Sequence, residues 1–218
     1  MLLVKPQWNP LMETTKFILI GGGGHARVVS SIIEAQETYH LEGIFDSNPK
    51  IKTLDGVEIF HEYQPDLFPN ASAIVAIGDN RIRKQLAQTI NHVFGVLIHP
   101  SASLDRLSSV GGGSVVMHRA VIQRGTRVGK HGIINTASSI DHDCVLGDFV
   151  HIAPNATLCG GVVIGDETFV GAGAVVLPQI KIGKRVTVGA GAVVTKNIPD
   201  GATVVGNPGK IITSYGAN

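Results

Sequence analysis

A six-residue period of branched aliphatic residues runs through the second half of the chain. Every sixth position is Val, Ile or Leu, at Val110, Val116, Ile122, Val128, Ile134, Ile140, Leu146, Ile152, Leu158, Ile164, Val170, Val176, Ile182, Val188 and Val194. A period of six is neither helical nor a plain two-residue alternation. A fixed short period is typical of stacked repeats, so each hexapeptide is predicted to form one short strand and its turn.

Small residues occupy two further positions of the repeat. Two residues before most of the aliphatics stands a small side chain, as at Ser114, Thr126 and Cys144, and glycine often follows the aliphatic, as at Gly129 and Gly147. We expect the aliphatic to fill a narrow core, the small residue to fit beside it, and glycine to tolerate the bend. Three such strands close one triangular coil, so residues eighteen positions apart stack and the stretch predicts a parallel β-helix of about five coils.

The N-terminal part alternates short apolar runs with helical patterns. Lys16–Ile20 is suited to a buried parallel strand and leads into four glycines and a helix. The other predicted elements are strands at 40–46, 73–77 and 93–98, a loop at 47–56, and a helix from Asn80 to about Ile90. Ile82, Leu86 and Ile90 are expected on the apolar face of that helix. This order of elements predicts a Rossmann-like half-domain in the α/β class.

The junction between the first strand and the first helix consists of Gly21, Gly22, Gly23, Gly24 and His25. It meets the relaxed dinucleotide fingerprint, and Asp46 follows at the end of the next strand. Glycines let the backbone approach phosphates at a helix N-terminus, and Asp46 can accept a hydrogen bond from a ribose or uracil. NAD, a nucleotide-sugar or a purely structural turn all fit the motif. Since this part supplies only half of a two-lobed NAD site, a nucleotide-sugar fits better.

Composition indicates a thin aliphatic protein and no nucleic-acid partner. Aromatic residues make up 5% of the chain, 27 residues are glycine, and the formal net charge is +1. The sequence contains no long apolar span and no signal peptide, so no membrane insertion is expected. Cys144 and Cys159 lack metal-ligand spacing, which predicts reduced thiols and a cytoplasmic location.

The repeat and the glycine loop together carry a resemblance to a known family. The repeat resembles that of the hexapeptide acyltransferases, whose β-helix is left-handed, an exception to the usual right-handed crossover. A Rossmann-like domain with a Gly-Gly-His loop before it resembles the sialic acid O-acetyltransferase and bacterial UDP-amino-sugar N-acetyltransferase family of the pilin glycosylation type. The resemblance implies acetyl-CoA as co-substrate, no metal, and a UDP-linked 4-amino-dideoxysugar as substrate for surface glycan or glycoprotein synthesis. It also implies a homotrimer with acetyl-CoA between its helices.

The same resemblance divides the chain into four parts. These are an N-terminal extension at 1–14, a nucleotide-sugar-binding domain at 15–97, the β-helix at 98–212 and a tail at 213–218. Met1 and Met12 are both candidate start residues. His25 matches the family histidine that lies near the sugar.

Four histidines interrupt the aliphatic solenoid, at His118, His131, His142 and His151. His142 stands between Asp141 and Asp143, two residues after Ile140, and this position places it at a turn. A neighbouring carboxylate fixes the tautomer of an imidazole and raises its basicity, as a general base requires; a solvated polar turn is the alternative. The resemblance implies that His142 is the base and Asp143 its orienting acid. The family has glutamate there, so Asp141 is the other candidate for the orienting role.

Gly160 stands eighteen residues, hence one coil, beyond His142, and Gly161 follows it. The resemblance places the amide that binds the thioester oxygen at this position, so Gly160 is expected to be the donor. His151 stands nine residues from His142, half a coil, so the two rings face apart on one helix. His151 and Asn135 are therefore expected to contact CoA in a groove between subunits, and His118 and His131 to be surface residues.

The C-terminal Gly206-Asn-Pro-Gly-Lys210 resembles a family motif that has alanine in place of Gly209. Lys210 is expected to meet a CoA phosphate, or the segment to cap the last coil.

Three other functions share features of this sequence. Sugar O-acetylation of the sialic acid type uses the same base and stays open. A γ-type carbonic anhydrase needs two histidines five residues apart, which this solenoid lacks, and an oxidoreductase needs a second nucleotide lobe.

Overall fold

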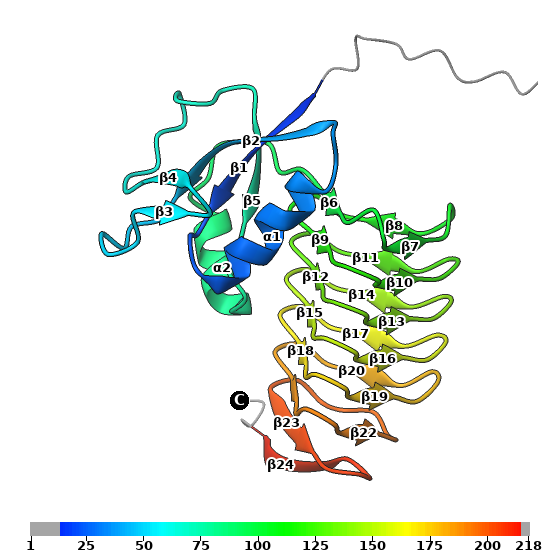
Figure 1. The fold of residues 1–218 in the computed structure, drawn as a ribbon. Coiled ribbons are helices and arrows are strands. Elements are labelled where there is room, and N and C mark those ends of the chain that lie inside the picture. The colour runs from blue at the N-terminus through cyan, green and yellow to red at the C-terminus, as the bar shows by residue number, and fades with distance from the viewer. Residues whose placement is uncertain (1–13, 215–218) are drawn as a thin grey trace, which may run out of the picture.

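The computed structural model describes residues 14–214, which form an α/β domain followed by a long solenoid (Figure 1). The extension expected at 1–14, with its two candidate start residues, and the tail expected at 213–218 lie almost entirely outside the described residues.

The N-terminal domain is built on a five-stranded sheet of order β3-β4-β2-β1-β5. Its elements are β1 (Thr15–Ile20), α1 (Gly24–Glu34), β2 (Tyr39–Phe45), β3 (Thr53–Leu54), β4 (Val57–Phe60), β5 (Ser72–Val75) and α2 (Asn80–Ala87). Neighbouring strands are parallel except for β3 and β4. The predicted strand, glycine turn, helix and strand are confirmed. The loop predicted at 47–56 is wrong in part, because β3 lies inside it and pairs with β4.

The predicted apolar face of α2 is correct in part: Leu86 packs against the core and Ile90, just past the helix, is buried, but Ile82 is not. Ile82 is 43% exposed, whereas Arg83 and Ala87 are buried. Ile82 lines a cavity in the N-terminal domain instead of its core. The apolar period misled here because the side of α2 toward the solenoid meets backbone carbonyls, to which an arginine can donate hydrogen bonds.

The solenoid consists of two-residue strands. They are β6 (Leu97–Ile98), β7 (Ser103–Leu104), β8 (Ser109–Val110), β9 (Val115–Val116), β10 (Val121–Ile122), β11 (Arg127–Val128), β12 (Ile133–Ile134), β13 (Ser139–Ile140), β14 (Val145–Leu146), β15 (His151–Ile152), β16 (Thr157–Leu158), β17 (Val163–Ile164), β18 (Phe169–Val170), β19 (Val175–Val176), β20 (Lys181–Ile182), β21 (Thr187–Val188) and β22 (Val193–Val194). Each strand from β6 to β19 pairs in parallel with the third strand after it, as Val121 of β10 does with Ser139 of β13, up to the pair β19 and β22. Three parallel sheets result.

The coil count agrees with the prediction. Strands β6 to β20 form five three-strand coils, and β21, β22 and a bridge between Ile182 and Ile198 begin a sixth. The antiparallel pair β23 (Ala202–Val205) and β24 (Lys210–Ser214) follows. All the periodic aliphatics are the second residues of their strands, and all are buried except Val110, which is half-buried.

The solenoid bends at a different position from the one expected. Residues with positive φ recur every six positions, for example His131 (φ 55), Ala137 (φ 55), Asp143 (φ 59) and Phe149 (φ 58). The glycines after the aliphatics have another role: a Cβ on Gly129 would lie 2.6 Å from the carbonyl carbon of the glycine one coil away. These glycines are therefore needed for close stacking of the coils, and the expectation that they make the bend is wrong.

The N-terminal domain packs on one of the three sheets of the solenoid, the sheet that contains β6, β9, β12, β15 and β18 (Figure 1). Phe17 and Leu19 of β1 share a buried cluster with Leu97, Val115 and Ile133 of that sheet. The apolar core is thus continuous from one domain into the other. Neither helix in residues 14–214 is long and apolar enough to cross a membrane.

Candidate active site

His142 lies in the turn after β13, at a different corner of the coil from the one the N-terminal domain covers. Its Nδ1 pairs with Oδ2 of Asp143 at 2.9 Å, which leaves Nε2 as the free acceptor. Asp141 instead accepts the backbone N–H of His142 at 2.7 Å. The hydrogen bond that Asp143 accepts from the ring, reinforced by the charge of Asp141, raises the pKa of the His142 imidazole. Of the two carboxylates, Asp143 is therefore the one that holds the ring.

Gly160 faces the ring of His142 from the next coil. A Cβ on Gly160 would lie 2.6 Å from Nε2 of His142, so glycine is required for the ring to occupy this place. The Gly161 N–H is already bonded to the carbonyl of His142 at 2.9 Å. The Gly160 N–H makes no hydrogen bond within the described part of the chain. An unshielded donor therefore lies beside the free nitrogen of an oriented imidazole.

A second polar cluster lies where the domains meet. Asn135 Nδ2 and His151 Nε2 are 3.0 Å apart, and His151 Nδ1 donates to the carbonyl of Gly78 at 3.2 Å. The ring of His25 lies 6.4 Å from that of His151, and among residues 14–214 no partner exists for its buried Nε2. Burial, with the charge of Arg83 second, lowers the pKa of both histidines to about 4. Both rings are therefore neutral near pH 7.

The glycine loop lies beside Asp46, whose Oδ2 accepts the N–H of Gly22 at 2.6 Å. Gly21 has φ +113, and a Cβ on Gly22 would lie 2.8 Å from a neighbouring side chain, so the fold itself needs glycine at both positions. A Cβ on Gly23 or Gly24 would meet nothing within 4 Å. These two glycines leave open space at the N-terminus of α1, the kind of space into which a phosphate group fits.

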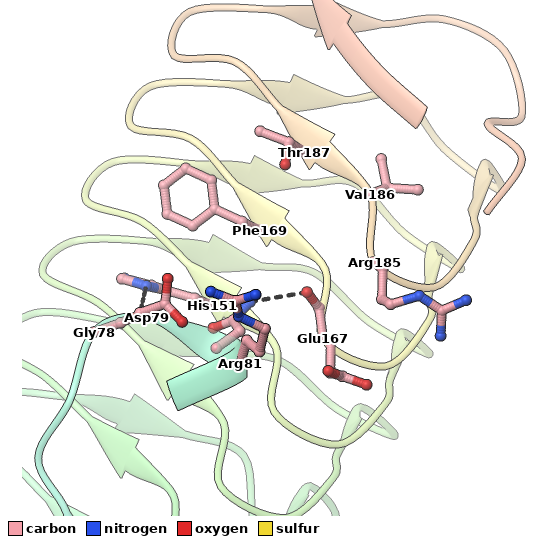
Figure 2. Close-up of a pocket in the computed structure, with 10 residues that line it drawn as sticks. Gly78, Asp79, Arg81, His151, Glu167, Phe169, Arg185, Val186 and Thr187 are labelled. Carbon is pink, nitrogen blue, oxygen red and sulfur yellow. Dashed lines mark hydrogen bonds between the residues drawn. The ribbon is translucent and has the colours of Figure 1, made fainter. Parts of the chain in front are cut away.

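Two cavities adjoin these residues. A cleft of about 490 Å³ separates the start of α2 from the solenoid, with His151, Phe169 and Thr187 of successive coils on one wall (Figure 2). A cavity of about 350 Å³ lies at the carboxyl ends of β1 and β2, with Asp46 and Tyr63 in its wall. Open α/β sheets bind ligands at this edge.

Known proteins show the same two-part organisation. Residues 16–90 match the PglD N-terminal domain, and residues 143–177 and 161–196 match the bacterial transferase hexapeptide of six repeats. The acetyltransferase domain of PglB from Neisseria gonorrhoeae, also solved in complex with acetyl coenzyme A, is 38% identical with a TM-score of 0.84. The likeness covers 91% of this chain and 100% of that one. The chain belongs to the PglD-type family of hexapeptide N-acetyltransferases.

Two further members of the PglD-type family are similar to this chain. PerB from Caulobacter crescentus, in complex with CoA and GDP-perosamine, is 36% identical with a TM-score of 0.85, over 91% of this chain and 97% of that one. UDP-N-acetylbacillosamine N-acetyltransferase of Bacillus subtilis is 39% identical over 109 residues, which are 45% of this chain. The match spans half of that curated relative, 50% of its length. The predicted family and the predicted fold, a Rossmann-like domain before a left-handed β-helix, are confirmed.

The structure gathers the predicted site residues of this family member into three groups. At the domain interface lie Gly21, Gly22, Gly23, Gly24, His25, Asp46, Asn135 and His151. At the opposite corner lie His142, Asp143, Gly160 and Gly161. Lys210 is exposed at the start of β24. Within one chain the first two groups are not brought together.

The other two solenoid histidines are not free surface residues. His131 is buried, stacked on Phe149 at 4.6 Å and against Phe94 at 4.4 Å, so the expectation for it is wrong. His118 is half-buried and stacks on His99 at 3.6 Å. His131 is covered by Phe94 from the segment before the solenoid, whereas His118 is covered by the first coil of the solenoid itself. In the described range no three His, Cys, Asp or Glu side chains lie close enough together to hold a metal ion.

Sequence reasoning missed Arg83, which no pattern marks as different from other helix arginines. It is fully buried between the two domains. The only sequence signal is its position one helical turn after Asn80, the residue to which it is bonded.

Proposed function

We propose that this protein transfers the acetyl group of acetyl-CoA to the amine of a nucleotide-linked 4-amino-dideoxysugar, with UDP as the nucleotide. The observation that supports it best is the outer corner, where Asp143 orients His142 and the free Nε2 lies against the open side of Gly160. The curated relatives support the substrate class, since they act on UDP- and GDP-linked amino sugars. UDP is preferred because the relative with the highest identity of the two uses it.

His142 is the general base of this proposal. As the sugar amine attacks the thioester carbon, Nε2 of His142 takes the proton that nitrogen loses. The carbon–sulfur bond then breaks, and the CoA thiolate leaves and is protonated. Asp143 stabilises the imidazolium through the bond it already makes to Nδ1. The acetyl group passes directly from CoA to the amine in this proposal, which assigns no role to Cys144 or Cys159.

The Gly160 N–H is the proposed donor to the oxyanion. Gly161 is a poorer candidate, since its own N–H is bonded to the carbonyl of His142. A donor aimed at the tetrahedral oxygen contributes about 2.7–4 kcal/mol to transition-state stabilisation.

The N-terminal domain is the proposed site for the nucleotide. The first backbone bond of α1 runs from Arg27 N–H to the carbonyl of Gly23, so the N–H groups between them are free for a diphosphate. The cavity next to Asp46 is large enough for a base and ribose. His25, at the N-terminus of α1, is the proposed contact to the sugar, with its ring 6.4 Å from that of His151.

The complete site then needs two chains. His142 lies at one corner of the coil, and the glycine loop packs near another. A homotrimer with the corner of one subunit against the N-terminal domain of the next joins the two groups. Asn135, His151 and Lys210 are placed on the path of CoA in this assembly.

An acceptor panel tests the proposal. Purified protein with acetyl-CoA is offered UDP-, GDP-, dTDP- and CMP-linked 4-amino sugars, and UDP sugars with a hydroxyl in place of the amine, while free CoA is followed. The expected result is CoA release with the UDP amino sugar and none with the matched hydroxyl sugar. Release with the hydroxyl sugar alone would point to O-acetylation, and release with no sugar would overturn the assignment.

A further inference from the structure

Arg83 is a buried cation that donates only to neutral acceptors. Its Nε donates to the carbonyl of His131 at 2.9 Å, and Nη1 to those of Ile77 and Gly78 at 3.0 and 3.2 Å. Nη2 reaches Asn80 Oδ1 at 2.7 Å and the carbonyls of Phe149 and Val150 at 3.0 and 3.2 Å. Every nitrogen of the guanidinium is engaged, and none of the six acceptors is a carboxylate. Burying a cation in this way is costly, so packing alone does not account for it.

The acceptors follow the repeat of the solenoid. His131 and Phe149 are eighteen residues apart, so Arg83 holds the same corner of two successive coils. Asn80, which Arg83 fixes, donates to the carbonyls of Glu167 and Thr168 at 3.0 and 3.2 Å, one coil further. The start of α2 is therefore bonded to three consecutive coils at one corner.

These hydrogen bonds can select one docking position for the N-terminal domain on a surface that repeats from coil to coil. The first three coils present similar aliphatic side chains to the N-terminal domain, at Leu97, Val115 and Ile133, so apolar packing discriminates poorly between neighbouring coils there. Coils are spaced by about 4.8 Å, the distance between neighbouring strands, and a slip of one coil would displace the glycine loop by that amount. Directional hydrogen bonds from a rigid guanidinium fork can select one register.

We propose that Arg83 and Asn80 are positioning residues that fix which coil of the solenoid the N-terminal domain docks on. They thereby set the position of the glycine loop along the solenoid axis relative to the His142 corner. They also hold the Gly78 carbonyl to which His151 donates. The inference rests on the proposed function only for its kinetic consequence. Its structural consequence, the anchoring of α2, stands apart from any activity.

The test compares Arg83→Met and Arg83→Lys with a control at the other end of the same interface. Gln36→Ala is that control, because Gln36 Nε2 also donates across the domains, to the Ile98 carbonyl at 2.6 Å. Asn80→Ala is the second variant, since it removes one coil contact without touching the buried cation and serves if the arginine variants do not fold. Each full-length variant is measured for kcat, both KM values, acetyl-CoA affinity by calorimetry, and hydrogen exchange of α2.

Both arginine variants are expected to lose about tenfold or more in kcat/KM for the nucleotide-sugar, from misplacement by an ångström or more. Arg83→Lys is not expected to restore kcat/KM, because the lysine ammonium group cannot span the six acceptors. Acetyl-CoA affinity should stay within about twofold, and α2 should exchange faster than in Gln36→Ala. Equal effects of Gln36→Ala and Arg83→Met on α2 and on kcat/KM would overturn the proposal. If the wild type transfers no acetyl group at all, the proposed function fails, while unchanged exchange of α2 would still count against the positioning role.

Discussion

One corner of the solenoid and the sheet that the N-terminal domain covers hold histidines in opposite states. At the outer corner His142 is exposed, bonded to Asp143, and its pKa is raised. At the domain interface His151 is buried near the Arg83 cation, and its pKa is lowered to about 4. Only the first can gain a proton near neutral pH with a carboxylate ready to stabilise the charge. The second is a neutral hydrogen-bonding group. One residue type thus stands in two electrostatic states, and the surroundings of each histidine decide which.

Replacing the two histidines separately gives the largest expected contrast. His142→Ala should lower kcat by about 10²–10⁴-fold, as for loss of a general base, with KM for both substrates nearly unchanged. His151→Ala should raise the KM for acetyl-CoA more than it lowers kcat. Steady-state kinetics of both variants check this, and a His142→Ala enzyme within a few-fold of wild-type kcat would show that the base lies elsewhere.

Gly160→Ala tests the space beside the imidazole. The new Cβ would lie 2.6 Å from Nε2 of His142, so the ring must move. A displacement of about 1 Å is expected to lower kcat by on the order of a hundredfold. The thermal midpoint, measured alongside, should change little because the side chain points to the exposed ring. Activity near that of the wild type would contradict the proposed placement of the acetyl group.

Asp143→Asn sharpens the role of the outer carboxylates through the pH profile. The base must be neutral to act, so wild-type kcat/KM should rise as pH passes the raised pKa of His142. Without the Asp143 bond that pKa falls, and the rising limb should move to lower pH while the plateau drops about fivefold. Asp141→Asn is the matched control and should shift the limb less, since Asp141 bonds the backbone and not the ring. A larger shift with Asp141→Asn would exchange the two roles.

Acid stability probes the interface corner. Folded His25, His131 and His151 take up protons only near pH 4, whereas unfolded histidine does so near pH 6.5. The unfolded state therefore binds more protons between these values, and stability should fall as pH drops from about 6.5 to 4, by up to about 1.4 kcal/mol per pH unit for each histidine. Urea unfolding at several pH values measures the slope, and His151→Gln should make it shallower. A flat curve over this window would contradict neutral burial.

Most of the fold was predicted correctly from the six-residue period of the sequence. Each hexapeptide contributes one inward aliphatic, so the β-helix and its register follow from local sequence. The contact of Gly160 with His142 follows from the same arithmetic of eighteen residues. What failed depends on long-range packing. His131 and Arg83 are buried because one domain covers the other, and nothing within either segment reports which face is covered.

The arrangement of the candidate site could be predicted from the sequence only in part. Asp143 as the partner of the His142 ring could not be chosen over Asp141 from sequence, because the choice depends on a positive φ of 59° that swings Asp143 alongside the imidazole. The pairing of Asn135 with His151 was equally hidden, since these residues come from adjacent coils.

Subunit mixing tests most directly the claim that one chain supplies the base and another the nucleotide site. His142→Ala removes the base, and Gly23→Val blocks the glycine loop at a position where the φ of −83° and the open space allow a side chain. The two inactive variants are unfolded together, refolded at equal concentration and assayed. If each site joins the His142 corner of one subunit to the loop of its neighbour, random trimers should regain about one quarter of wild-type activity. Recovery of no activity in mixed trimers would show that a single chain holds the whole site.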